Sequence, residues 1–195
     1  LTNVAAGGAG QDVVATTTTS GDIAVSAVSA TDNVSLTAAG GAITDGNGAT
    51  TNITAATLAA SAATGIDLDT EVASITAAVS GTGAIDIDEL NNVTLTSITT
   101  NNGSITIGAG GTTTIDNGGA GNAVTAAASG TISIIANGAT SNLVVNDGVQ
   151  SAAGTITLTA DDDLTISAKV MTTAGNGAIE LNAGTWLLST TDAAH

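Results

Sequence analysis

The sequence predicts an all-β fold, a parallel β-helix or β-solenoid of about eight coils with roughly 19–27 residues each. The first observation is a recurring phrase in which a small residue precedes apolar, polar and apolar residues, as in GSITI (103–107). The second is the spacing of the first isoleucine of this phrase, with intervals of 20, 23, 19, 20, 27, 24 and 23 residues. These isoleucines form the predicted structural ladder, which consists of Ile23, Ile43, Ile66, Ile85, Ile105, Ile132, Ile156 and Ile179.

The third observation is a composition that suits a thin, regular core. The chain is 43% hydrophobic but only 1% aromatic, and it has no Pro, Cys, Phe or Tyr. A compact globule would lack large side chains, whereas stacked coils can be filled with Ile, Val, Leu and Ala. We therefore expect a single β-solenoid domain over residues 1–195, with an irregular first coil at 1–20, regular coils at 21–182 and a terminal segment at 183–195.

Within each repeat, apolar residues alternate with polar ones, which predicts two or three short strands with one buried face. The isoleucine phrase supplies the first strand, and right-handed crossovers are the general rule between parallel strands. The stretch AATLAASAAT (55–64) is the most helix-like piece, and its alanines fit a close-packed solenoid wall equally well. A second strand phrase follows most copies of the first and reads NVSL (33–36), NVTL (92–95), NLVV (142–145) and DLTI (163–166).

The charge of the chain excludes several classes of partner. The formal net charge is −16, and Lys169 is the single basic residue. Such a surface repels nucleic-acid phosphates and anionic lipid headgroups. No apolar run approaches the ~20 residues of a membrane-spanning helix. We expect no nucleic-acid partner and no membrane insertion, and we interpret the opening LTNVAAGG as the start of a processed chain or of an internal segment.

The stretch GTITLTADDDLTISA (154–168) resembles the repeats of filamentous haemagglutinin-type exoproteins and related autotransporter passengers of bacteria. In those families, apolar residues recur in the same pattern about every 20 residues along a right-handed β-helix. The resemblance covers roughly residues 21–182 and implies an extracellular or cell-surface location with a structural or adhesive role. The three aspartates of this stretch, Asp161 to Asp163, are expected to form a solvent-facing turn between two strands.

Two pairs of aspartates are candidate metal ligands. Asp67 and Asp69 flank Leu68, and Asp86 and Asp88 flank Ile87 in the next repeat, so stacking would place each aspartate of one pair over one of the other. Carboxylate oxygens are ligands for Ca²⁺. The alternative is a solvated, mutually repulsive face, and no cofactor is expected apart from this Ca²⁺. The stretch GGAGQDVV (7–14) also matches one copy of a Ca²⁺-binding repeat motif, but no tandem copy follows it.

An enzyme is not expected. His195 is the only histidine and the last residue, so no Ser-His-Asp triad or histidine metal site can be assembled within a fold. An ice-binding face would need threonine at the same positions in nearly every coil. The residues that follow the ladder isoleucines are too mixed for this, being Ala24, Thr44, Asp67, Asp86, Thr106, Ser133, Thr157 and Glu180.

The functional prediction is based on the two ends of the solenoid. Open strand edges invite pairing with other chains, and natural repeat proteins close them with polar caps. The sequence shows no charged or Pro-rich cap, and Trp186 is a possible cap or inter-subunit contact. We therefore expect a rod or an end-to-end stacked filament in a bacterial adhesin or matrix fibre, as a homopolymer or as part of a longer chain. The alternative is a surface binding module, an adhesin stalk with an acidic face that takes up Ca²⁺ or a host ligand.

Overall fold

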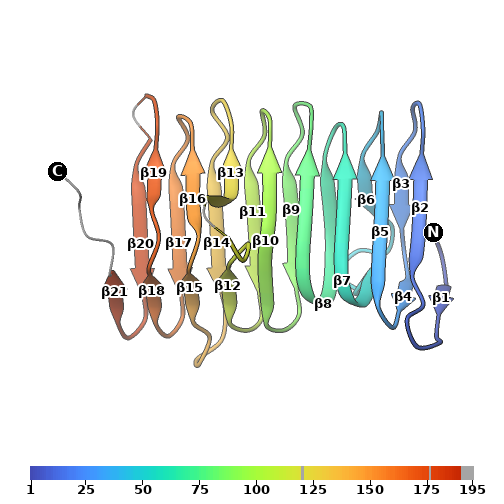
Figure 1. Ribbon diagram of the computed structural model, residues 1–195, viewed down its shortest axis with the longest axis horizontal. Helices are drawn as coiled ribbons and strands as arrows, with labels where there is room; N and C mark the ends of the chain where they lie inside the picture. The colour runs from blue at the N-terminus through green and yellow to red at the C-terminus, as the bar shows by residue number, and fades with distance from the viewer. Residues whose placement is uncertain (120, 176, 190–195) are drawn as a thin grey trace.

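The computed structural model describes residues 1–119, 121–175 and 177–189, and its strands stack as the coils of a β-solenoid (Figure 1). Every strand pairing is parallel, and strands of successive coils are neighbours. The predicted fold class is confirmed. The described residues form no helix, so none of their segments is a helix able to cross a membrane.

One long face of the rod carries the ladder isoleucines, and we call it the isoleucine face. Each isoleucine is the direct register partner of the next, from Ile23 to Ile179. The face consists of β3 (Ile23–Val25), β6 (Ile43–Asp45), the start of β8 (Ile66–Val79), β9 (Ile85–Glu89), β11 (Ile105–Ala109), β14 (Ile132–Ala136), β17 (Ile156–Ala160) and β20 (Ile179–Ala183).

The strands of the other long face point in the opposite direction to the strands of the isoleucine face (Figure 1). Its strands are single in the first five coils and are split into two short pieces in the next three. They are β2 (Val13–Thr17), β5 (Asn33–Ala38), β7 (Ile53–Ala62), the end of β8, β10 (Val93–Thr100), β12 (Thr113–Ile115) with β13 (Asn122–Ala126), β15 (Leu143–Val145) with β16 (Gly148–Ser151), β18 (Leu164–Ile166) with β19 (Val170–Thr172), and β21 (Leu187–Ser189).

The rod has nine coils instead of about eight, because residues before Ile23 contribute a coil of their own. This coil holds β1 (Val4–Ala6) and β2, which pair in register with β4 (Val28–Ala30) and β5. The isoleucine count misses this coil because no strand of the isoleucine face precedes β3. The expected irregular segment at 1–20 therefore contains two regular strands. The helix-like stretch at 55–64 lies mostly within β7, as solenoid wall.

Two loops account for the irregular spacing of the coils. In the 27-residue interval after Ile105, Ile115 and Val124 are the register partners of Leu95 and Ile98, so the extra residues lie between Ile115 and Val124 and the coil is otherwise regular. Residues 46–52 form a second loop. Ile43 pairs with Ile66 and Ile53 pairs with Thr70, so the chain from Ile43 to Ile53 has more residues than the stretch from Ile66 to Thr70 beside it. Loop length varies between coils, whereas the strand register does not.

The core is a column of aliphatic side chains between the two faces. Seven of the eight ladder isoleucines are at most 6% exposed, and Ile179 is 42% exposed because it lies in the last described coil. Burying one such side chain stabilises the fold by about 2 kcal/mol. Inward and outward positions alternate in β17, where Ile156, Leu158 and Ala160 are buried, and the alternation is broken where the register shifts, as at Ala123 and Val124 of β13. This alternation decides which polar side chains reach the surface.

Glycines occupy the corner that precedes each isoleucine strand, and several of them lie directly against the backbone of the preceding coil. A Cβ atom added to Gly103 would lie 1.8 Å from the carbonyl oxygen of Gly83. A Cβ on Gly130 would lie 2.1 Å from the oxygen of Gly103, and one on Gly154 would lie 2.1 Å from that of Gly130. Because backbone blocks each of these positions, no other residue fits there without moving a neighbouring coil.

Candidate functional site

The four candidate aspartates lie on the outer surface of the isoleucine face, and we call them the acidic stack. Asp67 is the register partner of Asp86, and Asp69 is the partner of Asp88. They alternate with Ile66, Leu68, Ile85 and Ile87, which are buried, so the carboxylates of β8 and β9 point outward. Adjacent strands are about 4.8 Å apart, so each pair brings two like charges together.

This crowding changes the titration of the acidic stack. Partial burial raises the pKa of Asp69 above its ordinary value of 3.8, and the charges of Asp45 and then Asp88 raise it further. Partial burial likewise raises the pKa of Asp86, with Asp88 and Asp67 as the repulsive neighbours. A like charge nearby and loss of water both disfavour the ionised carboxylate. The stack is therefore a repulsive feature of the surface at neutral pH.

Glu89 follows the stack but points inward. It is 3% exposed, and its Oε2 accepts hydrogen bonds from the Thr70 hydroxyl at 2.7 Å and the Val72 N–H at 3.0 Å. Oε1 accepts from the Asn91 N–H at 3.0 Å. Burial raises the pKa of Glu89, against the lowering effect of these donors. The alternation of apolar and acidic residues in IDIDE (85–89) by itself indicates an inward position for this glutamate.

The loop at residues 46–52 is fixed beside the acidic stack by Asn52. This residue is 1% exposed, and its Nδ2 donates to Asp45 Oδ1 and to the Val25 carbonyl, both at 2.8 Å. Its Oδ1 accepts the Asp69 N–H at 2.7 Å. Donors from the Asn47 backbone and from Asn52 lower the pKa of Asp45. The loop therefore forms one wall of a shallow depression.

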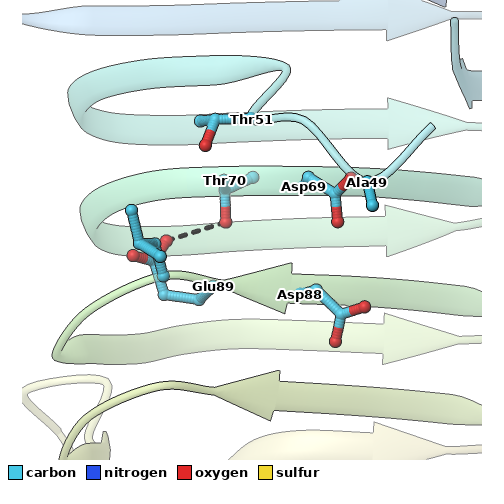
Figure 2. Close-up of a pocket in the computed structure, with 7 residues that line it drawn as sticks. Ala49, Thr51, Asp69, Thr70, Asp88 and Glu89 are labelled. Atoms are coloured by element: carbon cyan, nitrogen blue, oxygen red, sulfur yellow. Dashed lines mark hydrogen bonds between the residues drawn. The ribbon is translucent and has the colours of Figure 1, made fainter. Parts of the chain in front are cut away.

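Figure 2 shows this depression, with side chains from the loop, β8 and β9 around it. Ala49 and Thr51 come from the loop, while the acidic side is formed by Asp69, Asp88 and Glu89. Among the residues that the structure describes, no group of three or more His, Cys, Asp or Glu side chains is placed to hold a metal ion. The acidic stack forms pairs of carboxylates, and these pairs do not converge on one point.

The aspartate of the Ca²⁺-like motif is engaged by the protein itself. Asp12 Oδ1 accepts hydrogen bonds from the backbone N–H of Asn33 at 3.1 Å and from its Nδ2 at 3.0 Å. The same arrangement recurs at a corner further along the rod. There Asn92 Oδ1 accepts the Thr112 N–H at 2.7 Å, and Asn142 Oδ1 accepts the Asp163 N–H at 3.0 Å. Polar side chains at these positions connect one coil to the next.

The aspartate triplet forms the turn between β17 and β18. Asp161 is exposed, and its Oδ2 accepts the Gly138 N–H at 2.7 Å. Asp162 and Asp163 are half-buried. One carboxylate oxygen of Asp163, Oδ1, is buried without a hydrogen-bond partner in the described part of the chain. The triplet is thus a corner, and only its first member faces solvent freely.

Apolar side chains are exposed in the last described coil. Trp186 is 70% exposed, and its carbonyl accepts the Leu164 N–H at 2.9 Å. Ile179, Leu187 and Leu188 are 42%, 51% and 55% exposed. Most of the indole is in solvent, and its role as a cap or contact stays a prediction. His195, expected to be a frayed end, lies outside the described residues.

Comparisons with protein-family models, with curated proteins and with solved structures returned no match.

Proposed function

We propose that the chain is an extracellular structural protein, a rod or end-to-end stacked filament in a bacterial adhesin or matrix fibre. The observation that carries this proposal is the isoleucine ladder, which keeps one register through eight coils from Ile23 to Ile179. A core of this kind gives a continuous, stiff rod, and coil number sets its length. The resemblance of the repeat phrase to filamentous haemagglutinin-type exoproteins supports the extracellular setting.

The exposed apolar side chains of the last described coil support growth along the axis. Leu187 occupies the same column as Leu143 and Leu164, which are fully buried in their own coils. A further coil, from a second molecule or from a longer chain, would cover Leu187 in the same way. Contacts of this head-to-tail kind do not close on themselves and so generate fibres.

Negative-stain electron microscopy of the purified chain tests the filament form of the proposal. We expect uniform fibres, and we expect Leu187→Asp to abolish them because it places a charge on the stacking column. The matched control is Leu90→Asp, since Leu90 is 57% exposed in the turn between β9 and β10. Fibres that persist in Leu187→Asp would contradict end-on stacking, whereas short isolated rods in the wild type would favour the stalk of a binding module.

A further inference from the structure

The outward side of β2, β5, β7 from Thr57, β8 from Ser74, and β10 is free of charged residues, and we call it the hydroxyl face. Its central column consists of Thr16, Thr37, Ser61, Ala78 and Thr99, each the register partner of the next. The column beside it begins with Val14, which is 71% exposed, and continues with small residues. Segments 13–17, 33–38, 57–62, 74–79 and 93–100 contain no acid, although the chain has 17.

The acids are concentrated elsewhere. The isoleucine face carries the acidic stack and Glu180, and Asp161 to Asp163 lie in a turn. Over the first five coils the rod therefore has one long side whose strands carry acids and one long side whose strands carry none, with Asp12 and Asp32 at the corner just before β2 and β5. Further along the rod, Asp116 and Asp147 lie on the second long side. Two stacked sheets lie ~10 Å apart, so the isoleucine-face charges are about one Debye length from the second long side and are partly screened there by salt.

Three hydroxyl groups beside the central column already have partners within the rod. The Thr76 and Thr96 hydroxyls are 2.8 Å apart in a hydrogen bond, and the Thr96 hydroxyl also donates to the Ile75 carbonyl at 3.0 Å. The Thr57 hydroxyl donates to Asn33 Oδ1 at 2.5 Å. Covering a polar group costs less when its hydrogen bond is kept. Methyl groups of threonine, alanine and Val14 supply the apolar part of the surface.

The hydroxyl face is bounded and large enough for a weak dimer. The long loop between β12 and β13, which includes residues 116–119, ends the regular face after the fifth coil. Five strands at ~4.8 Å spacing and six residues at ~3.3 Å give about 500 Å² of projected area for each copy. Two such faces bury about 1,000 Å² in total, which is near the lower limit for a specific interface.

We propose that two copies of this chain pair through their hydroxyl faces, as two sheets stacked face to face. The argument for a second copy is electrostatic, because two chains with a charge of −16 can approach closely only where neither carries acids. A two-fold arrangement brings the same patch of each copy together, and small side chains allow close stacking of the two sheets. The pairing is lateral, so it is independent of end-on stacking.

Sedimentation equilibrium tests the pairing, with all variants in the Leu187→Asp background so that end-on growth does not interfere. We expect a dimer with a micromolar dissociation constant that becomes tighter as NaCl is raised. Thr99→Glu places a charge in the central column, and we expect it to weaken the dimer at least tenfold. Ser133→Glu is the matched control on the isoleucine face, where Ser133 lies outward in β14 between Thr106 and Thr157.

Circular dichroism shows whether each variant folds, and Ser61→Glu in the same column replaces Thr99→Glu if that variant does not. The proposal is overturned if the Leu187→Asp protein with an unchanged hydroxyl face stays monomeric at about 100 µM. Equal effects of the Thr99 and Ser133 variants also overturn it. Adsorption of such a monomer to ice or to crystalline polysaccharide through this face would assign the surface to that partner instead. Loss of fibres in the end-on test leaves the pairing unaffected.

Discussion

Single polar atoms have large consequences inside a core as thin as this one. Thr100 and Thr113 are both buried, at 3% and 0% exposure. The Thr100 hydroxyl donates to the Gly103 carbonyl at 2.5 Å, whereas Thr113 Oγ1 has no partner among the described residues. A buried hydroxyl without a partner loses its hydrogen bonds to water and gains none in the protein, which destabilises the folded state. The two threonines therefore allow a direct comparison between a buried hydroxyl with a hydrogen-bond partner and one without.

We expect Thr113→Val to raise the free energy of unfolding by about 1 kcal/mol, because it removes an unpaired hydroxyl from a column that contains Val93 and Leu143. Thr100→Val is expected to lower it by a similar amount, because the Gly103 carbonyl loses its donor. Urea denaturation measures both changes. Destabilisation by both variants would show that the Thr113 hydroxyl has a partner in solution, such as a buried water.

At the scale of elements, the ladder isoleucines differ in how completely their strands are covered. Ile105 is 0% exposed in β11, and Ile179 is 42% exposed in β20. We expect Ile105→Ala to lower the free energy of unfolding by about 3 kcal/mol, because it leaves a cavity between two coils. Ile179→Ala should cost less than about 1 kcal/mol in the monomer. Equal losses, measured by urea denaturation, would mean that Ile179 is covered in solution.

The acidic stack of β8 and β9 makes stability depend on pH. Asp69, Asp86 and Glu89 have raised pKa values, so the folded state binds their protons more tightly. Stability therefore increases as pH falls from 7 through these raised values. The pKa values of Asp45 and Asp116 are lowered, so their stabilising contribution is lost only as pH falls below their ordinary 3.8. Maximum stability is expected at about pH 4.

Thermal denaturation between pH 7 and pH 4 measures this dependence, and Asp86→Asn should reduce its slope because it removes one raised group and relieves Asp69. Asp162→Asn removes the same charge from the turn between β17 and β18 and is the control. A wild-type melting temperature that falls steadily from pH 7 downward would contradict the expectation.

The sequence predicted what depends on periodicity. Isoleucine spacing was sufficient to place all eight ladder positions in register, and the alternation around Leu68 and Ile87 placed the acidic stack outside. Periodicity was not sufficient to predict features that depend on loops and bulges. The extra residue between Leu95 and Ser97 shifts the register of β10, and hydroxyl columns can be traced only once that shift is known. Coil one was missed because it lacks an isoleucine strand.

At the scale of the whole molecule, a net charge of −16 is distributed over a long, thin rod. Self-repulsion destabilises the compact state, and salt screens it. We expect the melting temperature to rise between about 0.05 M and 0.5 M NaCl. Because the described residues contain no convergent metal cluster, Ca²⁺ and Mg²⁺ should act equally at matched ionic strength. A larger rise with Ca²⁺, reversed by EDTA, would favour the acidic binding module.

The corner glycines restrict how the length of this rod can change. Because Gly103, Gly130 and Gly154 each lie against the glycine of the coil before, a deletion or duplication is tolerated only if it restores that contact. Length is therefore quantised in whole coils, at about 4.8 Å per step. The loops at residues 46–52 and 116–119 are outside this constraint, so we expect inserted peptides to be displayed there without changing the step.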